Sequence, residues 1–171
     1  WMLAAGAELL PRLNAEQASL LQPALDEIAA HQAQILALPR ANLHADLFRD
    51  NVMFEGTHLS GVIDFYNACS GPMLYDIAIT LNDWCLDAQA GIDVPRAQAL
   101  LAAYAALRPF TAAEAELWPQ MLRVACVRFW LSRLIAAESF AGMDVMIHDP
   151  SEFEVRLAQR QQVAVKLPFA L

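Results

Sequence analysis

The sequence predicts one mainly α-helical lobe, residues 1–171, that carries a small β-hairpin. Two observations predict this class. Long segments repeat apolar residues at helical spacing, whereas near residues 50–66 two short apolar runs flank a turn signal. Hydrophobic residues make up 57% of the chain and the mean hydropathy is +0.33, so a well-filled core is expected.

Composition argues against several classes of function. The net charge of −8 disfavours a nucleic-acid partner, because phosphate backbones attract clustered Lys and Arg. Charged or polar residues interrupt the long apolar runs, so we expect no membrane span, and the first residues lack a signal-peptide pattern. Cys69, Cys85 and Cys126 have no metal-type spacing, and the last two lie in apolar helical surroundings typical of buried free thiols. A reducing, cytoplasmic location is expected.

The first long helix is predicted to begin after Asn14, because Asn14 and Gln17 have the spacing of a capping box. Apolar residues follow helical spacing to about Leu38. Pro23 is expected to mark a break or restart within this segment, and Pro39 is expected to end it.

The β-hairpin is predicted directly after this helical segment and a short loop. Residues 52–54 form an apolar run, residues 56–58 are typical of a turn, and residues 59–65 form the second strand. Pairing of the two strands would bring Asn51, directly before the first strand, beside Asp64, near the end of the second.

Helical spacing returns after the hairpin. One helix is predicted from Pro72 through Leu86, and a second, rich in Ala and Leu, follows Asp93 and ends near Arg108.

Two more helix starts are predicted from capping patterns. Thr111 and Glu114 have capping-box spacing and open a long helix in which Pro119 is a candidate kink. A last helix begins at residues 149–152, where Asp is the cap and Pro follows in the first turn.

One group of polar residues points to chemistry. Asp46 and Asn51 lie at the two ends of a short loop that leads into the hairpin, and Asp64 lies at the end of the second strand. The hairpin should therefore bring the Asn51 amide and the Asp64 carboxylate to a common point, with Asp46 nearby. Such hard oxygen ligands suit Mg²⁺, which prefers one or two carboxylates together with phosphate and water. Phosphoryl transfer also needs a base that orients the attacking hydroxyl.

The same residues carry a family resemblance. The pattern His-x-Asp-x-x-x-x-Asn, followed by Asp after the next strand pair, resembles the catalytic loop and metal-binding Asp of the protein-kinase-like fold. Here the loop begins His-Ala-Asp rather than His-Arg-Asp, and the metal Asp lies in Ile-Asp-Phe-Tyr rather than Asp-Phe-Gly. Both departures resemble the aminoglycoside and choline kinase branch, so the resemblance implies the C-terminal lobe of an aminoglycoside phosphotransferase-like fold.

A longer stretch narrows the resemblance. Residues 44–87, and the later RFWLSRL at 128–134, are similar to type II homoserine kinases, bacterial enzymes of threonine biosynthesis. The resemblance implies ATP-dependent phosphorylation of the hydroxyl of L-homoserine, a small-molecule substrate, with ATP as co-substrate and Mg²⁺ as cofactor.

The resemblance also assigns roles to single residues. Asp46 would be the catalytic base, and His44 would join it in the catalytic loop by bracing that loop. Asn51 and Asp64 would bind the magnesium of the nucleotide. Asp76, on the following helix, would support the loop structurally.

Substrate contacts are predicted from charge. Homoserine carries an ammonium and a carboxylate, so its site needs an acid and an arginine. Asp83 is the candidate for the ammonium, and Arg128 and Arg133 are candidates for the carboxylate. The two arginines point about 140° apart on a helix, so at most one is expected to face the site directly. The alternative is that they pair with surface acids such as Glu116 or Glu138.

Each motif residue has a structural alternative. His44 is compatible with a packed core histidine, Asp46 with a helix cap or turn residue, and Asn51 with the end of a turn. Arg49 and Asp50 are expected to be solvated or to tie the loop down, although Arg49 could also reach a phosphate.

A kinase of this fold also needs an N-terminal lobe with a phosphate-covering glycine-rich loop and a lysine. The six glycines are scattered and the single lysine is Lys166. We therefore expect residues 1–171 to be the C-terminal catalytic lobe, with the N-terminal nucleotide-binding lobe absent, an exposed apolar face toward it, and negligible activity alone.

Three other functions are compatible with the sequence. The acceptor hydroxyl could belong to an aminoglycoside, choline or a sugar. A non-catalytic kinase-like binding module would use the exposed apolar face to bind a partner. An all-helical structural domain would explain the composition but would leave the aspartate spacing to chance.

Overall fold

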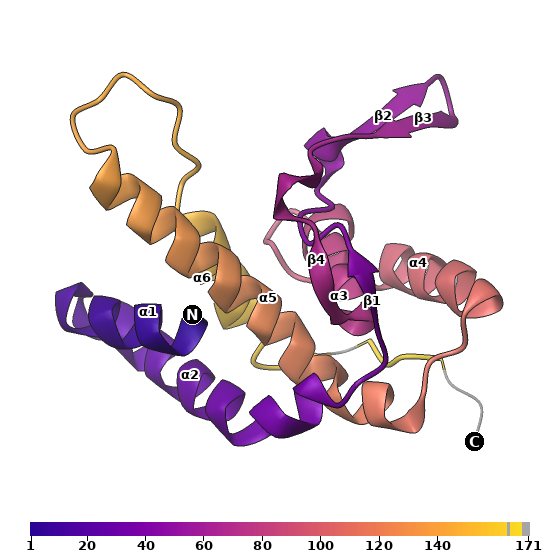
Figure 1. The fold of residues 1–171 in the computed structure, drawn as a ribbon, viewed down its shortest axis with the longest axis horizontal. Coiled ribbons are helices and arrows are strands. Elements are labelled where there is room, and N and C mark those ends of the chain that lie inside the picture. Colours follow the sequence, from indigo (N-terminus) through magenta and orange to yellow (C-terminus); the bar gives the residue numbers. More distant parts are fainter. Residues whose placement is uncertain (164, 169–171) are drawn as a thin grey trace.

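The computed structural model describes residues 1–163 and 165–168 and is mainly helical, with two small antiparallel strand pairs (Figure 1). Within that range the α-helices are α1 Met2–Leu9, α2 Ala15–Leu36, α3 Met73–Trp84, α4 Val94–Leu107, α5 Ala112–Ser139 and α6 Ser151–Gln159. The strands are β1 Arg40–Leu43, β2 Val52–Glu55, β3 His58–Val62 and β4 Cys69–Pro72. Short 3₁₀ turns are η1 Leu10–Arg12, η2 Arg49–Asn51 and η3 Phe65–Asn67. The predicted helical lobe with one hairpin is confirmed.

Helix α5 forms the centre of the core. It contacts α1, α2, α3 and α6, which surround it (Figure 1). Apart from Arg123 and Arg128, residues 121–131 in its middle turns are apolar and buried, as expected of a helix that is covered on most sides. Trp130, Leu131, Leu122 and Cys126 are fully buried there. This central helix therefore provides the wall against which the other elements pack.

Both predicted capping boxes are present. The Asn14 side chain accepts the Gln17 amide at 2.9 Å, and the Thr111 hydroxyl accepts the Glu114 amide at 3.2 Å. Each cap satisfies amide groups that the first helical turn leaves without intrahelical partners.

The predicted break at Pro23 is wrong, because α2 continues through this residue. Proline removes one helical hydrogen bond, but Leu21 and Leu25 on either side of it are buried in the core. Tertiary packing, which supplies most helical stability in proteins, keeps the helix intact there. Helix α5 likewise continues through Pro119.

The hairpin forms as predicted but is shorter. Val52 pairs with Val62 and Glu55 with His58, and Gly56 adopts a left-handed φ of 62° in the turn. The second strand ends at Val62 rather than at residue 65, because Asp64 also takes a left-handed φ of 66° and η3 follows. The hairpin projects from the helical body (Figure 1).

The pairing of β1 with β4 was not predicted. Arg40 lies opposite Pro72 and Leu43 opposite Cys69. The four-residue strands carry little period-2 signal, and their partners are distant in sequence. This pairing ties together the two ends of the segment 44–68, so the whole segment projects from a fixed base.

The later helices agree closely with the prediction. Helix α3 ends two residues earlier than expected, while α4 begins after Asp93, whose carboxylate accepts the Arg96 amide at 3.1 Å. Before α6, the Asp149 carboxylate accepts the Ser151 amide at 2.8 Å, but the N-cap of the helix is Pro150 and not the predicted Asp149.

All three cysteines are free thiols. Cys85 and Cys126 are buried free thiols as predicted, whereas Cys69 is exposed. None of the helices found in residues 1–163 and 165–168 has the length and apolar character that crossing a membrane requires.

Candidate active site

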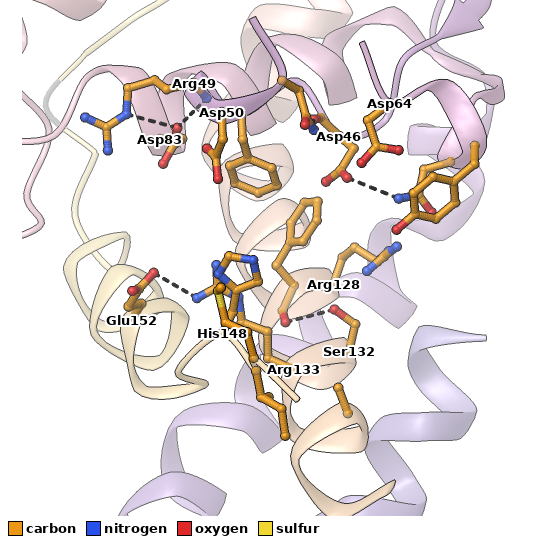
Figure 2. Close-up of a pocket in the computed structure, with 18 of the residues that line it drawn as sticks. Asp46, Arg49, Asp50, Asp64, Asp83, Arg128, Ser132, Arg133, His148 and Glu152 are labelled. Carbon is orange, nitrogen blue, oxygen red and sulfur yellow. Dashed lines mark hydrogen bonds and ion pairs between the residues drawn. The ribbon is translucent and has the colours of Figure 1, made fainter. Parts of the chain in front are cut away.

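A cavity of about 640 Å³ lies between the loop before the hairpin, the end of α3, and helices α5 and α6 (Figure 2). Asp46, Asn51 and Asp64 all line it, together with Asp83 and Arg128. The predicted convergence of three oxygen-bearing side chains on one open site is therefore present in the structure.

Hydrogen bonds of 2.8 to 3.2 Å connect the chain segments that carry these three residues. The Asn51 side-chain amide donates to the Asp46 carbonyl at 2.8 Å, and the Asn51 carbonyl accepts the Ile63 amide at 3.0 Å. The first contact closes the loop, and the second joins the start of β2 to the residue before Asp64. A further amide, from Asn67, donates to the Asp46 carboxylate at 3.2 Å.

Burial raises the pKa of Asp46 above its ordinary value of 3.8. The Asn67 hydrogen bond and the positive charge of Arg128 act in the opposite direction, and the charge of Asp64 adds to the increase. A carboxylate with a raised pKa is a better proton acceptor than a fully solvated one, provided that it stays ionised at the working pH.

Asn51 and Asp64 have the chemistry of magnesium ligands. The amide nitrogen of Asn51 is engaged with the loop, so its oxygen remains as the coordinating atom. Asp64 is exposed at the cavity. In the part of the chain that the structure describes, no three His, Cys, Asp or Glu side chains form a metal-binding group. Two protein oxygens fit a Mg²⁺ ion that takes its other ligands from phosphate and water.

Asp76 supports the loop from the first turn of α3. Its two carboxylate oxygens accept the main-chain amides of His44 at 2.8 Å and Ala45 at 2.7 Å. Ala45 has a left-handed φ of 63°, a conformation that non-glycine residues rarely adopt. The Asp76 contacts hold this strained turn directly before Asp46.

His44 contacts the back of the site and does not line the cavity. Its Nε2 lies 2.8 Å from the Ile63 carbonyl, and its ring lies 4.6 Å from the Phe65 ring. The side chain is buried. These contacts suit the predicted bracing of the loop, because they connect His44, two residues before Asp46, to Ile63, directly before Asp64.

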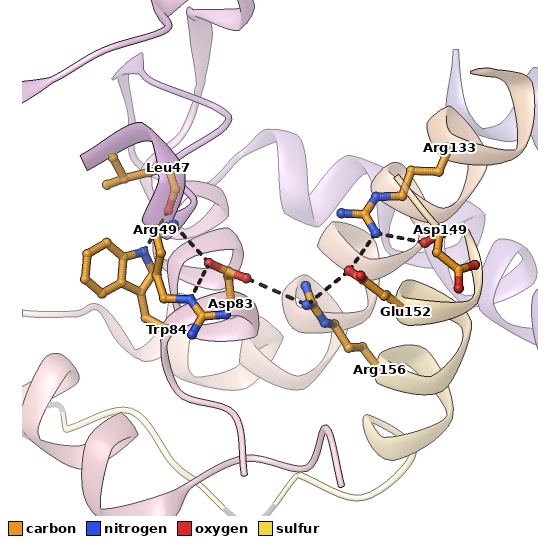
Figure 3. Close-up of polar contacts among 8 residues, drawn as sticks. All are labelled: Leu47, Arg49, Asp83, Trp84, Arg133, Asp149, Glu152 and Arg156. Carbon is orange, nitrogen blue, oxygen red and sulfur yellow. Dashed lines mark hydrogen bonds and ion pairs between the residues drawn. The ribbon is translucent and has the colours of Figure 1, made fainter. Parts of the chain in front are cut away.

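Asp83 has arginine partners on both sides (Figure 3). Its Oδ2 accepts the main-chain amide of Arg49 at 3.0 Å and the Arg49 Nε at 3.2 Å, and its Oδ1 lies 3.7 Å from Arg156. This geometry favours a role in fixing the loop over the predicted contact with a substrate ammonium. Arg49 ties the loop down, which was one of its predicted alternatives.

Both predicted arginines line the cavity, although only one was expected to face it, because the cavity extends along α5. Arg133 donates to the Glu152 carboxylate at 2.8 Å and to the Asp149 carbonyl at 2.9 Å. Its acidic partner is thus on α6 and is neither Glu116 nor Glu138. Arg128 lies over the Phe129 ring, with its guanidinium carbon 4.8 Å from the ring centre.

Several residues of the cavity were not identified from the sequence. Asn67 touches Asp46, and Glu152 and Arg156 contribute from α6. Asn67 lies three residues after Asp64, which is the only sequence signal that could have indicated it. The α6 residues are about a hundred positions away from the loop, and no local pattern connects them to it.

Comparison with known proteins identifies the family. A family model described as "Phosphotransferase enzyme family" matches residues 1–110, more than half of the chain. The chain belongs to this phosphotransferase family. A solved structure of an ethanolamine kinase from Plasmodium vivax aligns with a TM-score of 0.61 at 14% identity, covering 93% of the phosphotransferase chain and 46% of the kinase. The predicted kinase-like fold class is confirmed.

Relatives of the phosphotransferase chain include several homoserine kinases. The chain is 72% identical over 171 residues to the homoserine kinase of Pseudomonas aeruginosa strain UCBPP-PA14, covering all of this chain and 54% of that protein. It is 48% identical over 168 residues to the homoserine kinase of Methylobacillus flagellatus, covering 95% of this chain and 52% of that protein. The chain spans about half the length of these curated relatives.

Proposed function

We propose that the chain is the C-terminal catalytic lobe of an enzyme that uses ATP to phosphorylate the hydroxyl of L-homoserine. The observation that carries the proposal is the opening of Asp46, Asn51 and Asp64 into one cavity. The 72% identity to a homoserine kinase supports the choice of acceptor.

In the proposed reaction, the acceptor hydroxyl is oriented by Asp46. As the hydroxyl oxygen bonds to the γ-phosphorus, its proton passes to the Asp46 carboxylate, and the bond between that phosphorus and the leaving ADP oxygen breaks. The raised pKa of Asp46 favours its role as the proton acceptor. Asn67 and the loop contacts of Asn51 fix the position of this carboxylate.

The Asn51 oxygen and the Asp64 carboxylate would hold Mg²⁺ with the nucleotide. When bound, the ion would neutralise negative charge on the transferred phosphoryl group. Asp76 and His44 would act only by keeping the loop in place, since neither side chain lines the cavity.

We also propose that an N-terminal nucleotide-binding lobe completes the site. Met53, Phe54 and Leu59 on the hairpin are each about half exposed, which suits packing against an apolar surface. The chain itself contains neither a glycine-rich loop nor a lysine near the cavity. Residues 1–171 alone should therefore have negligible kinase activity.

The test is ADP release by the protein that carries this chain together with the proposed lobe. L-Homoserine should give the highest kcat/KM in a panel with choline, ethanolamine and an aminoglycoside, and ³¹P NMR should identify O-phosphohomoserine. A higher kcat/KM for another acceptor would overturn the substrate. The absence of any phosphotransfer by a folded protein would overturn the reaction and favour a binding module.

A further inference from the structure

The charged side chains that line the cavity are mostly paired with one another. Arg49 and Arg156 face Asp83, and Arg133 and Arg156 face Glu152, at distances from 2.8 to 3.7 Å (Figure 3). Each of these groups has its charge compensated within the protein. In each of these four ion pairs, both charged groups already have an oppositely charged partner and are less available to a ligand.

Asp50 is different. Its carboxylate makes no hydrogen bond or ion pair with residues in the described ranges, yet it lines the cavity on the same loop as Asp46. Figure 2 shows this carboxylate directed into the cavity between Asp83 and Asp46. The Arg49 side chain is directed to Asp83 instead, so the neighbouring arginine does not neutralise Asp50.

The position of Asp50 is also fixed. It is the middle residue of η2, and both neighbours are tied down: Arg49 by its main-chain amide to Asp83, and Asn51 by its side chain to the Asp46 carbonyl. A charged group on such a prepared loop loses little conformational freedom when a ligand binds.

Arg128 is the cation of the same cavity that has no acidic partner in the described ranges. It lines the same cavity, it lies over the rings of Trp1 and Phe129 at 5.2 and 4.8 Å, and it has no carboxylate partner among the described residues. Its positive charge is close enough to Asp46 to act toward a lower pKa of that carboxyl, although burial has the larger effect and raises it. Apart from the proposed base Asp46 and the proposed magnesium ligand Asp64, the cavity lining in the described ranges therefore has one uncompensated anion, Asp50, and one uncompensated cation, Arg128.

We infer that Asp50 binds the ammonium group of an α-amino acid acceptor, while Arg128 binds its carboxylate. This inference rests on the proposed function and assigns to Asp50 the role first considered for Asp83. An ammonium at Asp50 would also relieve the repulsion among the carboxylates of Asp46, Asp50 and Asp64, which share one rim of the cavity. A site with both charges free rejects acceptors that lack either one, because the unmatched group would stay unpaired.

The experiment compares three acceptors in the protein that carries this chain and the proposed lobe. L-Homoserine has both charges, 4-hydroxybutanoate lacks the ammonium, and 3-aminopropan-1-ol lacks the carboxylate. Asp50→Asn should lower kcat/KM for L-homoserine about ten- to hundredfold more than for 4-hydroxybutanoate. Arg128→Met should instead lower kcat/KM for L-homoserine more than for 3-aminopropan-1-ol, which has no carboxylate for Arg128 to bind.

Three further variants make the result specific. Asp26→Asn removes an exposed acid of α2 outside the cavity and should match the parent protein on all acceptors. Asp83→Asn should lower kcat/KM for all three acceptors by similar factors, because it loosens the loop. Asp50→Glu keeps the charge and should retain the preference for L-homoserine.

Two outcomes would overturn the inference. If Asp50→Asn lowers kcat/KM equally for L-homoserine and 4-hydroxybutanoate, Asp50 does not bind the ammonium, although the proposed function stands. If the parent protein does not phosphorylate L-homoserine, the proposed function fails, and calorimetric titration with L-homoserine decides the inference separately. Weaker binding of L-homoserine by Asp50→Asn than by the parent protein would still support it, whereas equal or absent binding would overturn it.

Discussion

The loop at residues 44–51 has aspartates on two sides that play opposite roles. On the side toward α3, Asp76 and Asp83 accept main-chain amides of the loop at 2.7 to 3.0 Å. On the side toward the cavity, Asp50 and Asp64 are exposed and Asp46 accepts only one side-chain amide. The acids behind the loop are committed to the protein, and the acids in front of it are available to a ligand.

This difference follows from geometry. Asp76 and Asp83 are seven residues apart on α3, which is about two helical turns, so both face the loop from one side of the helix. Their carboxylates replace hydrogen bonds that a loop cannot make within itself. The loop is thereby held rigid, and its own side chains remain free for the cavity.

The largest effect is expected on the front face. Asp46→Asn should lower kcat for L-homoserine about 10²- to 10⁴-fold, because the hydroxyl loses its proton acceptor. Steady-state kinetics on the protein with the proposed lobe would measure it, and urea unfolding should show that the variant stays folded. A kcat within threefold of the parent value would place the base elsewhere.

On the side of the loop toward α3, a substitution should lower the free energy of unfolding. Asp76→Ala leaves the amides of His44 and Ala45 without their ionised acceptor, so the free energy of unfolding should fall by about 2–4 kcal/mol. Equilibrium urea denaturation of the chain measures this value. Asp26→Ala, at an exposed position of α2, is the matched control and should change it by less than about 0.5 kcal/mol. Equal effects of the two substitutions would contradict the supporting role of Asp76.

The raised pKa of Asp46 predicts a smaller, pH-dependent effect. The folded state binds a proton at Asp46 more tightly than the unfolded state, so ionisation of Asp46 reduces stability as pH rises from 3.8 through the folded pKa. Asp46→Asn should therefore be more stable than the parent chain at pH 7 and equal to it below pH 3.8. Urea unfolding at several pH values tests this. A variant less stable at pH 7 would mean that the carboxylate is stabilising.

The smallest effect is expected in the hairpin. Leu59 is half exposed, so Leu59→Ser should change the free energy of unfolding of the chain by less than about 0.5 kcal/mol. Leu74, fully buried at the start of α3, is the contrast, and Leu74→Ala should lower that free energy by about 2–5 kcal/mol. A large loss from Leu59→Ser would show that the hairpin belongs to the core of this lobe.

The sequence by itself determined the elements that depend on near neighbours. Both capping boxes, the hairpin and the start of α4 were predicted correctly, because their hydrogen bonds join residues only a few positions apart. The same holds for Asn51, whose carbonyl accepts the Ile63 amide directly before Asp64, because the hairpin brings these neighbouring segments together. The continuity of α2 through Pro23 was mispredicted, because burial of Leu21 and Leu25 is a tertiary effect.

Only the tertiary structure decided which charges are paired. Asp83 meets Arg49 and Arg156, and Arg133 meets Glu152, across separations of 19 to 73 residues that no local pattern encodes. Asp50, which the sequence predicts to be solvated or to tie the loop down, is left by these pairings as a carboxylate of the cavity lining without an arginine partner in the described ranges. Spacing along the chain fixes which groups a loop presents, but the packing of α3, α5 and α6 determines which of them keep an unpaired charge, because each ion pair needs its partner brought within a few ångströms.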